Sequence, residues 1–322
     1  MNNPDSVPIS AEDEIQWLTA YRARNNLSWA ALGLETGIPR GTLQPLLTGI
    51  YGGDLQAQAK RIFTFRQKVE SQEARAHSAL AKPKFIATPT AKTLQGLLEI
   101  AHMGRIIVAA TGPGTGKTLT AEEYAASVSS CWRVTMREST STLSGMLHAV
   151  MKAMGLDSMS GWNRQRSEQI IEHVRGRKGL LIVDEANHLG LAELEELRAW
   201  HDVTGLGIAL FGNEELLMRI RSGSNRQAYA RLNSRIANAL IQDVPRQGDV
   251  DAFLDAFDID DGKARKLLSS VALSPHNGGL REVKQILETA HMLAIVDDTA
   301  IELSHIEDAM GSRITQHVRR AA

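Results

Sequence analysis

RIIVAATGPGTGKT, residues 105–118, is the stretch that decides the fold. Its apolar run, residues 106–110, predicts a short and fully buried strand, and the helical pattern after the glycine-rich turn begins at Lys117. A strand, a glycine loop and a Lys-Thr pair that opens a helix are together typical of a phosphate-binding loop. The sequence therefore predicts an α/β fold with a parallel sheet, organised around a nucleotide site.

The loop residues are expected to bind the phosphates of ATP. Glycine lets consecutive backbone N–H groups curl around phosphate oxygens where a Cβ would obstruct them, and the helix N-terminus adds partial positive charge. Lys117 should reach the β- and γ-phosphates, and the Thr118 hydroxyl should ligate Mg²⁺. Thr111 stands where the usual pattern has its first glycine, which we interpret as a tolerated variation. The expected phosphate-binding residues of this stretch are Gly112, Pro113, Gly114, Thr115, Gly116, Lys117, Thr118 and Leu119.

Two further apolar runs end in polar residues. GLLIVDEANHL, residues 179–189, predicts a central parallel strand followed by Asp184 and Glu185. We expect Asp184 to hold the Mg²⁺ shell and Glu185 to polarise the attacking water; an ordinary strand end with charged residues is the alternative. GIALFGNEEL, residues 207–216, predicts another buried strand that ends at Asn213. The Asn213 amide could position the water beside the γ-phosphate, or it could be a simple cap.

A basic stretch follows these strands. A run of charges is most often a solvated face, but an arginine here could also reach a neighbouring subunit's γ-phosphate. Arg235 is the first candidate for this role and Arg231 the second. The arginines of the stretch are Arg219, Arg221, Arg226, Arg231 and Arg235.

Composition shifts predict three domains. They are an N-terminal helix-turn-helix domain (1–80), an ATPase core (84–243) and a C-terminal helical lid (244–322), with Pro245 and Gly248 marking the last boundary. Arg281, at the start of the third lid helix, is expected to approach the phosphates from the lid, although it could be a surface residue. Basic residues of the tail could contact DNA phosphates: Arg313, His317, Arg319 and Arg320.

The N-terminal segment has the pattern of two short helices joined by a turn. Gly37 supplies the turn and Gly33 allows the helices to cross closely. Residues on the second helix that could face DNA are Arg40, Thr42 and Gln44, while Pro45 is awkward inside a helix. A third helix with several basic residues is expected over residues 55–69. The alternative is a packing module that makes no DNA contact.

The composition limits the function classes. The 322 residues carry a formal net charge of −1, so nucleic-acid binding must come from local basic patches. The single Cys131 excludes an internal disulfide framework and fits a reducing cytoplasm. No apolar run reaches the ~18–20 residues of a membrane span, so we expect a cytoplasmic protein with no membrane partner.

The motifs together resemble those of AAA+ ATPases: the phosphate loop, Asp184-Glu185, Asn213, a candidate trans arginine and Arg281 occur in that order. The resemblance extends over nearly the whole chain to the B proteins of Mu-type transposing phages. It is carried by L-E-T-G and G-T-L, Y-G-G-D, V-D-E-A-N-H-L-G, L-E-E-L-R and A-R-L-N-S-R-I. Besides Thr111, Asn187 departs from the expected pattern, and neither is expected to abolish hydrolysis.

This resemblance implies an ATP hydrolase that is stimulated by DNA and by oligomerisation. It implies that the protein coats double-stranded target DNA as a helical homo-oligomer with little sequence preference and delivers it to a transposase. If the chain is phage-encoded, it would act in the host cytoplasm. On the ATPase core, the residues expected to contact DNA are Arg137, Arg164 and Arg166.

Two other functions are alternatives. An ATP-regulated helix-turn-helix transcriptional regulator would give a discrete DNA footprint independent of ATP. A small-molecule kinase is disfavoured, because Asp184-Glu185 and a helical lid suit water attack and no acceptor site is evident.

Overall fold

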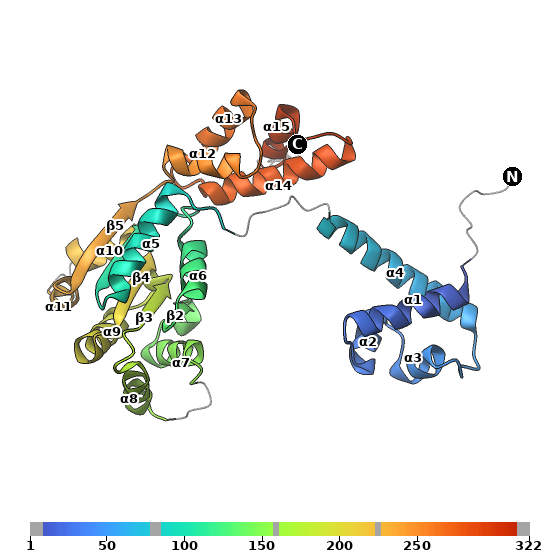
Figure 1. Ribbon diagram of the computed structural model, residues 1–322, viewed down its shortest axis with the longest axis horizontal. Helices are drawn as coiled ribbons and strands as arrows, with labels where there is room; N and C mark the ends of the chain where they lie inside the picture. The colour runs from blue at the N-terminus through green and yellow to red at the C-terminus, as the bar shows by residue number, and fades with distance from the viewer. Residues whose placement is uncertain (1–8, 78–84, 157–160, 223–226, 314–322) are drawn as a thin grey trace, which may run out of the picture. The chain divides into compact units, whose positions relative to one another are not determined.

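The computed structural model describes residues 9–77, 85–156, 161–222 and 227–313. The chain divides into two compact units, Met1–Ala79 and Leu80–Ala322 (Figure 1). Each unit has its own hydrophobic core and is described by itself.

The N-terminal unit is helical. Its helices are α1 (Ala11–Arg24), α2 (Trp29–Thr36), α3 (Arg40–Leu47) and α4 (Leu55–His77). The Ser10 side chain caps α1 by accepting a hydrogen bond from the Asp13 amide at 3.3 Å. The apolar faces of the helices meet in one core, made of Leu18, Leu32, Ile38, Leu43, Leu46 and Ile62.

A tight turn joins α2 to α3. Gly37 adopts a φ of 69° and donates its N–H to the Gly33 carbonyl at 3.0 Å. A Cβ on Gly33 would lie 3.2 Å from the Ile38 carbonyl oxygen, a tight contact that is consistent with the expected close crossing of the two helices. Pro45 lies inside α3, which nevertheless continues to Leu47. Helix α4 continues beyond residue 69, the expected end, to His77.

The second unit is built on a five-stranded parallel sheet with the order β2-β3-β4-β1-β5. The strands are β1 (Ile106–Thr111), β2 (Cys131–Thr135), β3 (Leu180–Asp184), β4 (Gly207–Gly212) and β5 (Ile236–Gln242). Every residue of β1, β3 and β4 is buried, as expected for a parallel sheet that is covered on both faces. The predicted α/β fold class is confirmed.

Helices cover both faces of this sheet (Figure 1). One face packs against α5 (Pro89–His102) and α6 (Lys117–Ser127) around Ile107, Ala109 and Phe211. The other face packs against α7 (Leu143–Ala153), α8 (Asn163–Val174), α9 (Leu191–Thr204) and α10 (Glu214–Ser222), with the short helix α11 (Ala230–Asn233). Alternate residues of β1 therefore enter opposite cores, which is the period-2 alternation of a strand.

The helices α12 (Gln247–Asp255), α13 (Gly262–Ala272), α14 (Leu280–Val296) and α15 (Leu303–Arg313) form a separate core. Gly248, which the sequence suggested as a boundary marker, lies inside α12. A buried carboxylate joins this cluster to the start of α5: Asp249 accepts hydrogen bonds from the Thr90 amide at 2.7 Å and from its hydroxyl at 2.5 Å. Asp249 is fully buried, and these donors compensate its loss of water.

Candidate functional site

The ends of three neighbouring strands bring the predicted nucleotide residues together. In a parallel sheet all carboxyl ends lie at one edge, where ligands of open α/β sheets bind. β1 runs into the phosphate loop, β3 ends at Asp184, and β4, which lies between them, ends at Gly212. Residues far apart in the sequence therefore meet at this edge.

The glycines of the loop are required by close backbone approach. A Cβ on Gly112 would lie 1.8 Å from the Asp243 carbonyl oxygen, and one on Gly114 would lie 2.0 Å from that of Gly278. Gly114 and Gly116 also have φ values of 70° and 93°, which disfavour other residues. Glycine is therefore needed at these positions so that the loop can pack against the backbone of Asp243 and Gly278 and turn into α6, whose N-terminal amides are the groups that fit a phosphate.

Thr111 has a structural reason for standing at the loop entrance. It is the last residue of β1 and is buried, and its hydroxyl lies 2.7 Å from that of Thr115. The Thr115 hydroxyl also donates to the Gly112 carbonyl at 3.0 Å. The departure from glycine therefore adds hydrogen bonds inside the loop.

Lys117 crosses from the loop to the next strand. Its ammonium group donates to the carbonyl oxygens of Thr111 and Gly212, the second at 2.9 Å. Burial lowers the pKa of Lys117, and the nearby carboxylates of Glu185 and Asp184 oppose that shift. The lysine is positioned between β1 and β4, where a phosphate bound in the loop would meet it.

The predicted metal ligands are in contact. The Thr118 hydroxyl donates to the Asp184 carboxylate at 2.9 Å, and the Glu185 amide donates to its other oxygen at 3.0 Å. Asp184 is only 1% exposed, and among the described residues no Lys or Arg lies within ion-pair distance of it. A hydroxyl and a carboxylate are hard oxygen donors, so this pair fits Mg²⁺. Within the described ranges no cluster of three or more His, Cys, Asp or Glu could hold another metal.

Glu185 lies in a strained turn. Its φ of 54° is unusual for a residue other than glycine, and its side chain is exposed. Arg219, on α10, fixes the turn that follows by donating to the carbonyls of Asn187 at 3.0 Å and Leu189 at 3.2 Å. The sequence indicated Arg219 only as part of a basic stretch and carried no signal for this positioning contact.

Asn213 follows β4 and is exposed beside Gly212. Its side-chain oxygen accepts from the Leu216 amide at 3.3 Å, which is the capping role given above as the alternative. The cap uses the oxygen, and the amide nitrogen is the atom that could donate to a phosphate or water.

The predicted lid segment begins, with α14, against the phosphate loop. The Leu280 amide donates to the Gly114 carbonyl at 3.1 Å, and a Cβ on Gly279 would lie 2.7 Å from the Pro113 carbonyl oxygen. This contact places Arg281, the second residue of α14, next to the loop. The positive charge of Arg281 also contributes to lowering the pKa of Lys117, so the two cations face the same region.

Arg231 and Arg235 lie at the other edge of the sheet. Arg235 immediately precedes β5, and Ile236 pairs with Ile106 at the start of β1. Because β1 has six residues, this edge is about 20 Å from the phosphate loop. The two arginines are therefore not brought together with the nucleotide residues of the same chain.

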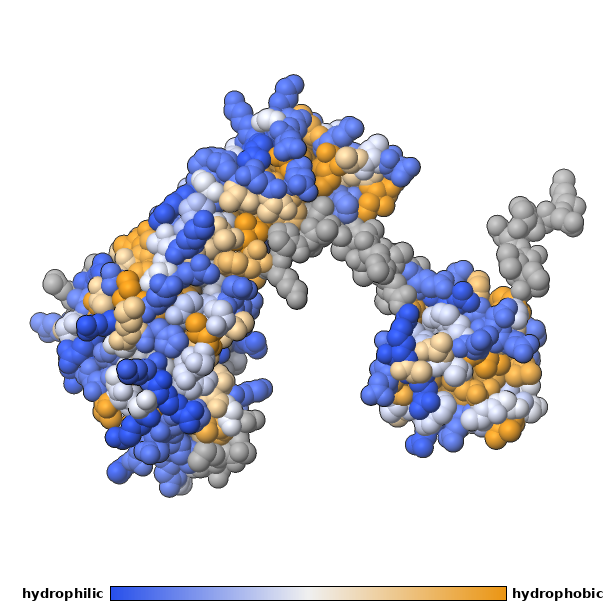
Figure 2. Space-filling view, in the orientation of Figure 1, coloured by the Kyte–Doolittle hydropathy of each residue, from blue (hydrophilic) through white to orange (hydrophobic). Residues whose placement is uncertain are grey.

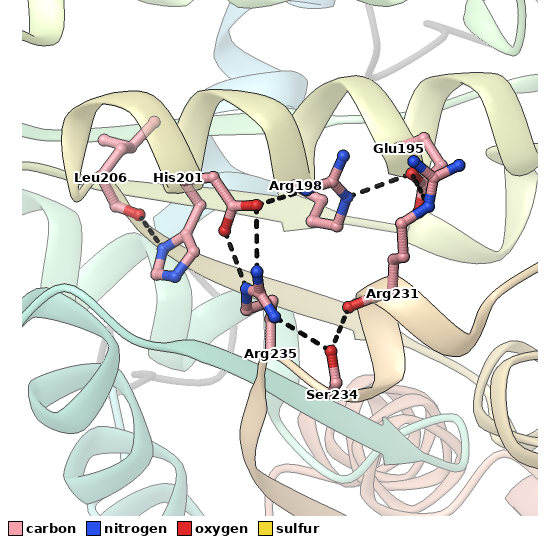
Figure 3. A network of polar contacts seen from close by, with 8 residues as sticks. Glu195, Arg198, His201, Leu206, Arg231, Ser234 and Arg235 are labelled. Carbon is pink, nitrogen blue, oxygen red and sulfur yellow. Dashed lines mark hydrogen bonds and ion pairs between the residues drawn. The ribbon is translucent and has the colours of Figure 1, made fainter.

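A network of charges holds these arginines (Figure 3). Arg235 donates to both carboxylate oxygens of Asp202, at 2.9 and 3.4 Å, and Arg198 pairs with the same carboxylate. The hydrogen bond from Arg235 is the main cause that lowers the pKa of Asp202. Arg231 is held less tightly, since its ion pair to Glu195 is 3.6 Å long and its side chain is 76% exposed.

The predicted DNA contacts lie on both units. Arg40 and Gln44 are exposed on α3 and Thr42 is partly exposed. Arg137 is exposed just after β2, and Arg164 is exposed at the start of α8, where it pairs with Glu168 at 3.0 Å.

Arg166 donates to Ser144 at 3.3 Å, which connects α8 to the first turn of α7. The surface over α8 is hydrophilic (Figure 2).

Of the other basic residues predicted to contact phosphates, Arg313 pairs with Glu282 at 2.7 Å. Four basic residues named above lie outside the described residues: Arg226, His317, Arg319 and Arg320.

Comparison with protein families and solved structures agrees with this geometry. A family model of AAA domains matches residues 101–220. A second model, of the C-terminal part of Mu B transposition proteins, matches residues 234–312. Among solved structures, Cdc6p of Pyrobaculum aerophilum superposes with a TM-score of 0.54 over 72% of this chain and 69% of that one. At 14% identity that likeness shows the fold alone.

Two relatives match over most of their length. The Mu-like prophage FluMu DNA transposition protein B of Haemophilus influenzae is 30% identical over 274 residues, 84% of this chain and 94% of that protein. The ATP-dependent target DNA activator B of Escherichia phage Mu is 30% identical over 268 residues, 82% of this chain and 83% of that protein.

The fold and the phosphate-binding edge of the sheet define a P-loop ATPase of the AAA class. More narrowly, the chain belongs to the Mu B family of transposition proteins. The family and fold predicted from the motifs are thus confirmed. In the part of the chain that the structure describes, no helix has the length and apolar character needed to cross a membrane.

Proposed function

We propose that this chain is an ATP-dependent target-DNA activator, which assembles on double-stranded DNA with little sequence preference and delivers it to a transposase. The observation that carries the proposal is the 30% identity to a protein named as an ATP-dependent target DNA activator, and the convergence of Lys117, Thr118 and Asp184 at one edge of the sheet supports it. Transposase, duplex DNA and further copies of this chain are its proposed partners.

The proposed nucleotide chemistry uses the edge formed by β1, β3 and β4. The amides of residues 114–118 and the Lys117 ammonium bind the phosphates, with Gly112, Pro113, Leu119 and Arg281 adjoining them. Thr118 and Asp184 are the ligands for Mg²⁺, which when bound neutralises negative charge on the phosphate oxygens. Glu185 orients a water molecule and accepts its proton, while the Asn213 amide nitrogen holds that water in line.

The opposite edge supports a site shared between copies. Arg235 cannot serve the phosphates of its own chain across about 20 Å, so it would act on a neighbour. Arg231, whose guanidinium pairs with Glu195 in the first half of α9, is the second candidate. Arg235 is the first candidate, and it would have to exchange Asp202 for a phosphate. The exchange is chemically reasonable because guanidinium binds carboxylate and phosphate with the same fork of donors.

DNA binding is proposed for the cations Arg137, Arg164 and Arg166 on the ATPase unit. They would contact phosphates, which carry charge but little sequence information. Arg40, Thr42 and Gln44 of α3 are the candidates on the N-terminal unit.

Fluorescence anisotropy with labelled duplexes tests the proposal. The protein is titrated onto two unrelated sequences of equal length with ATP, with ADP and without nucleotide, over a range of salt. Equal affinity for both sequences, dependent on ATP and falling steeply with salt, is expected.

Electron microscopy of the ATP-bound complexes should show continuous assemblies on DNA. A discrete footprint that is independent of ATP would instead favour a transcriptional regulator. Failure to stimulate strand transfer by the transposase encoded with this chain would contradict the delivery role.

A further inference from the structure

The basic residues of α4 form a surface that the motifs did not assign. Lys60, Thr64 and Lys68 are spaced by four residues and lie on one face of the helix, next to Arg61. They line a hollow of about 350 Å³ together with Glu35 and Phe65. Lys60, Arg61, Thr64 and Lys68 are all exposed.

The cations of this hollow differ from the other basic residue nearby. Arg66, on the same helix, is paired with Glu14 at 3.3 Å and with Glu70 at 2.7 Å. In the described part of the chain no carboxylate lies within ion-pair distance of Lys60, Arg61 or Lys68. Arg66 thus pairs with Glu14 and Glu70, whereas the face of α4 that carries Lys60, Arg61 and Lys68 keeps its positive charge without a paired carboxylate among the described residues.

The negative charge of the hollow is confined to one wall. Glu35 is the carboxylate among the lining residues, and it accepts a hydrogen bond from the Tyr21 hydroxyl at 3.0 Å. The C-terminal end of α2 adds partial negative charge to the same wall. An anion in the hollow would therefore contact the α4 wall.

One aromatic side chain of the hollow, Phe65, is held by other aromatic rings. Phe65 packs edge-on against Tyr21 and Trp17, with ring centroids 5.3 and 6.0 Å apart. Of the residues that line the hollow, Phe65 alone has a large apolar side chain. Protein interfaces have an apolar centre with depleted charge, so a surface of this composition suits a polyanion better than a folded protein partner.

We propose that the Lys60–Arg61–Lys68 face of α4, rather than the outer face of α3, is the main phosphate-binding surface of the N-terminal unit on duplex DNA. Lys60 and Lys68 are eight positions apart on the helix, which corresponds to about 12 Å, similar to the width of the major groove. By contrast, the eight residues of α3 carry one charged side chain, Arg40. Since phosphate neutralisation dominates non-specific affinity, three unpaired cations outweigh one.

This inference rests on the proposed DNA binding, and a matched pair of full-length variants tests it. The test variant is Lys60→Gln/Lys68→Gln, and the control is Lys263→Gln/Lys266→Gln, which removes the same charge from exposed positions on α13. With ATP present, the slope of log affinity against log salt should become shallower by about 1.8 in the test variant and change little in the control. DNA-free ATP hydrolysis should remain as in the wild type for both variants.

A cysteine probe gives a second, direct measurement. Burial raises the pKa of Cys131, the single cysteine of the sequence, to about 12, and a Cys131→Ser background removes this partly exposed thiol altogether. A Thr64→Cys variant would therefore label at one site, and duplex DNA with ATP should slow maleimide labelling several-fold. Poly-glutamate at equal charge concentration should protect less.

The outcomes separate this inference from the proposed function. Wild-type binding that is ATP-dependent, combined with an unchanged salt slope in Lys60→Gln/Lys68→Gln, would refute the α4 surface alone. A larger loss in Arg40→Gln than in the double variant, or stronger protection by poly-glutamate than by DNA, would refute it as well. If the wild-type protein does not bind duplex DNA with ATP, both proposals are wrong.

Discussion

The two edges of the central sheet handle charge in opposite ways. At the carboxyl edge, Lys117, Asp184 and Glu185 influence one another without forming an ion pair, and Asp184 is buried with hydroxyl and amide donors only. At the amino edge, Arg235, Arg198 and Asp202 form a closed network on the surface (Figure 3). Among the described residues, the charged groups of the carboxyl edge therefore have no oppositely charged partner in contact with them. At the amino edge, by contrast, Arg235 is already paired with Asp202 of the same chain.

In the proposed assembly on DNA, this difference would make the site of one protomer depend on an arginine of the next. A site whose groups converge in one chain can bind nucleotide alone, but its completion in trans would require an arginine to leave Asp202. Substitutions at each edge can separate nucleotide binding by one chain from the proposed contribution of a neighbouring arginine.

Lys117→Ala tests the carboxyl edge and has the broadest expected effect, because every ATP-dependent property should be lost with it. Hydrogen bonds to charged groups contribute roughly 1.5–3 kcal/mol each, so ATP affinity should fall about tenfold to a hundredfold for each phosphate hydrogen bond that the substitution removes. Calorimetric titration with ATP measures this, and ATP-dependent DNA binding should disappear as well. Lys152→Ala, an exposed residue on α7, is the control, and wild-type ATP affinity in Lys117→Ala would contradict the phosphate-loop assignment.

Arg235→Ala tests the amino edge. Arginines supplied to a phosphoryl-transfer site increase the rate roughly 10³–10⁵-fold, so hydrolysis in DNA-bound assemblies should fall toward the basal rate. Nucleotide binding to the isolated protomer should be unchanged, which calorimetry at low protein concentration can check. If the stimulation persists in Arg235→Ala and is lost in Arg231→Ala, the more exposed arginine is the one that acts.

Glu185→Gln separates binding from chemistry at the carboxyl edge. Removing a general base typically costs about 10²–10⁴ in rate, while phosphate contacts are retained. Phosphate release should slow by that factor, and the lifetime of ATP-dependent DNA complexes should increase. Glu307→Gln, exposed on α15, provides a neutral comparison, and unchanged turnover in Glu185→Gln would remove this residue from its proposed role.

Asp202→Asn has the smallest expected effect. The lowered pKa means that the Asp202 network stabilises the fold above the ordinary Asp pKa of about 3.9, and that this stabilisation is lost as the pH falls through the lowered value. A surface ion pair contributes about 0.2–1 kcal/mol, so the Tm should drop by roughly 1–3 °C at pH 7. Thermal unfolding of both proteins from pH 8 to 3 should show a constant difference down to about pH 5 that shrinks below about pH 4. A difference that grows on acidification would contradict the network.

The sequence predicted which residues meet at the carboxyl edge, because these residues lie in short contiguous stretches. The residues from Gly112 to Thr118 lie in one turn, and Asp184 lies at the end of an uninterrupted apolar run. The contact between Thr118 and Asp184 could be anticipated from the strand ends alone.

The rest depends on contacts between distant residues. Asp249 and Thr90 are separated by 159 positions, and neither belongs to a recognisable motif. The sequence does not indicate strand β5, because its residues are half exposed and follow an arginine-rich stretch. The first turn of α5 is also not indicated, because the prolines around it are typical of a linker. The pairing of Arg235 with Asp202 depends on where α9 ends relative to β5, which no local pattern specifies.

The hydrogen bond from Leu280 to Gly114 joins the first turn of α14 directly to the phosphate loop. With 17 residues, α14 is about 25 Å long, so a small rotation about its first turn, beside the phosphate loop, would become a large displacement at its other end. A rotation of α14 by about 10° about its first turn would move its C-terminal end by roughly 4 Å. That end presents Met292 and Val296, which are 66% and 82% exposed, so such a rotation would displace an exposed apolar surface.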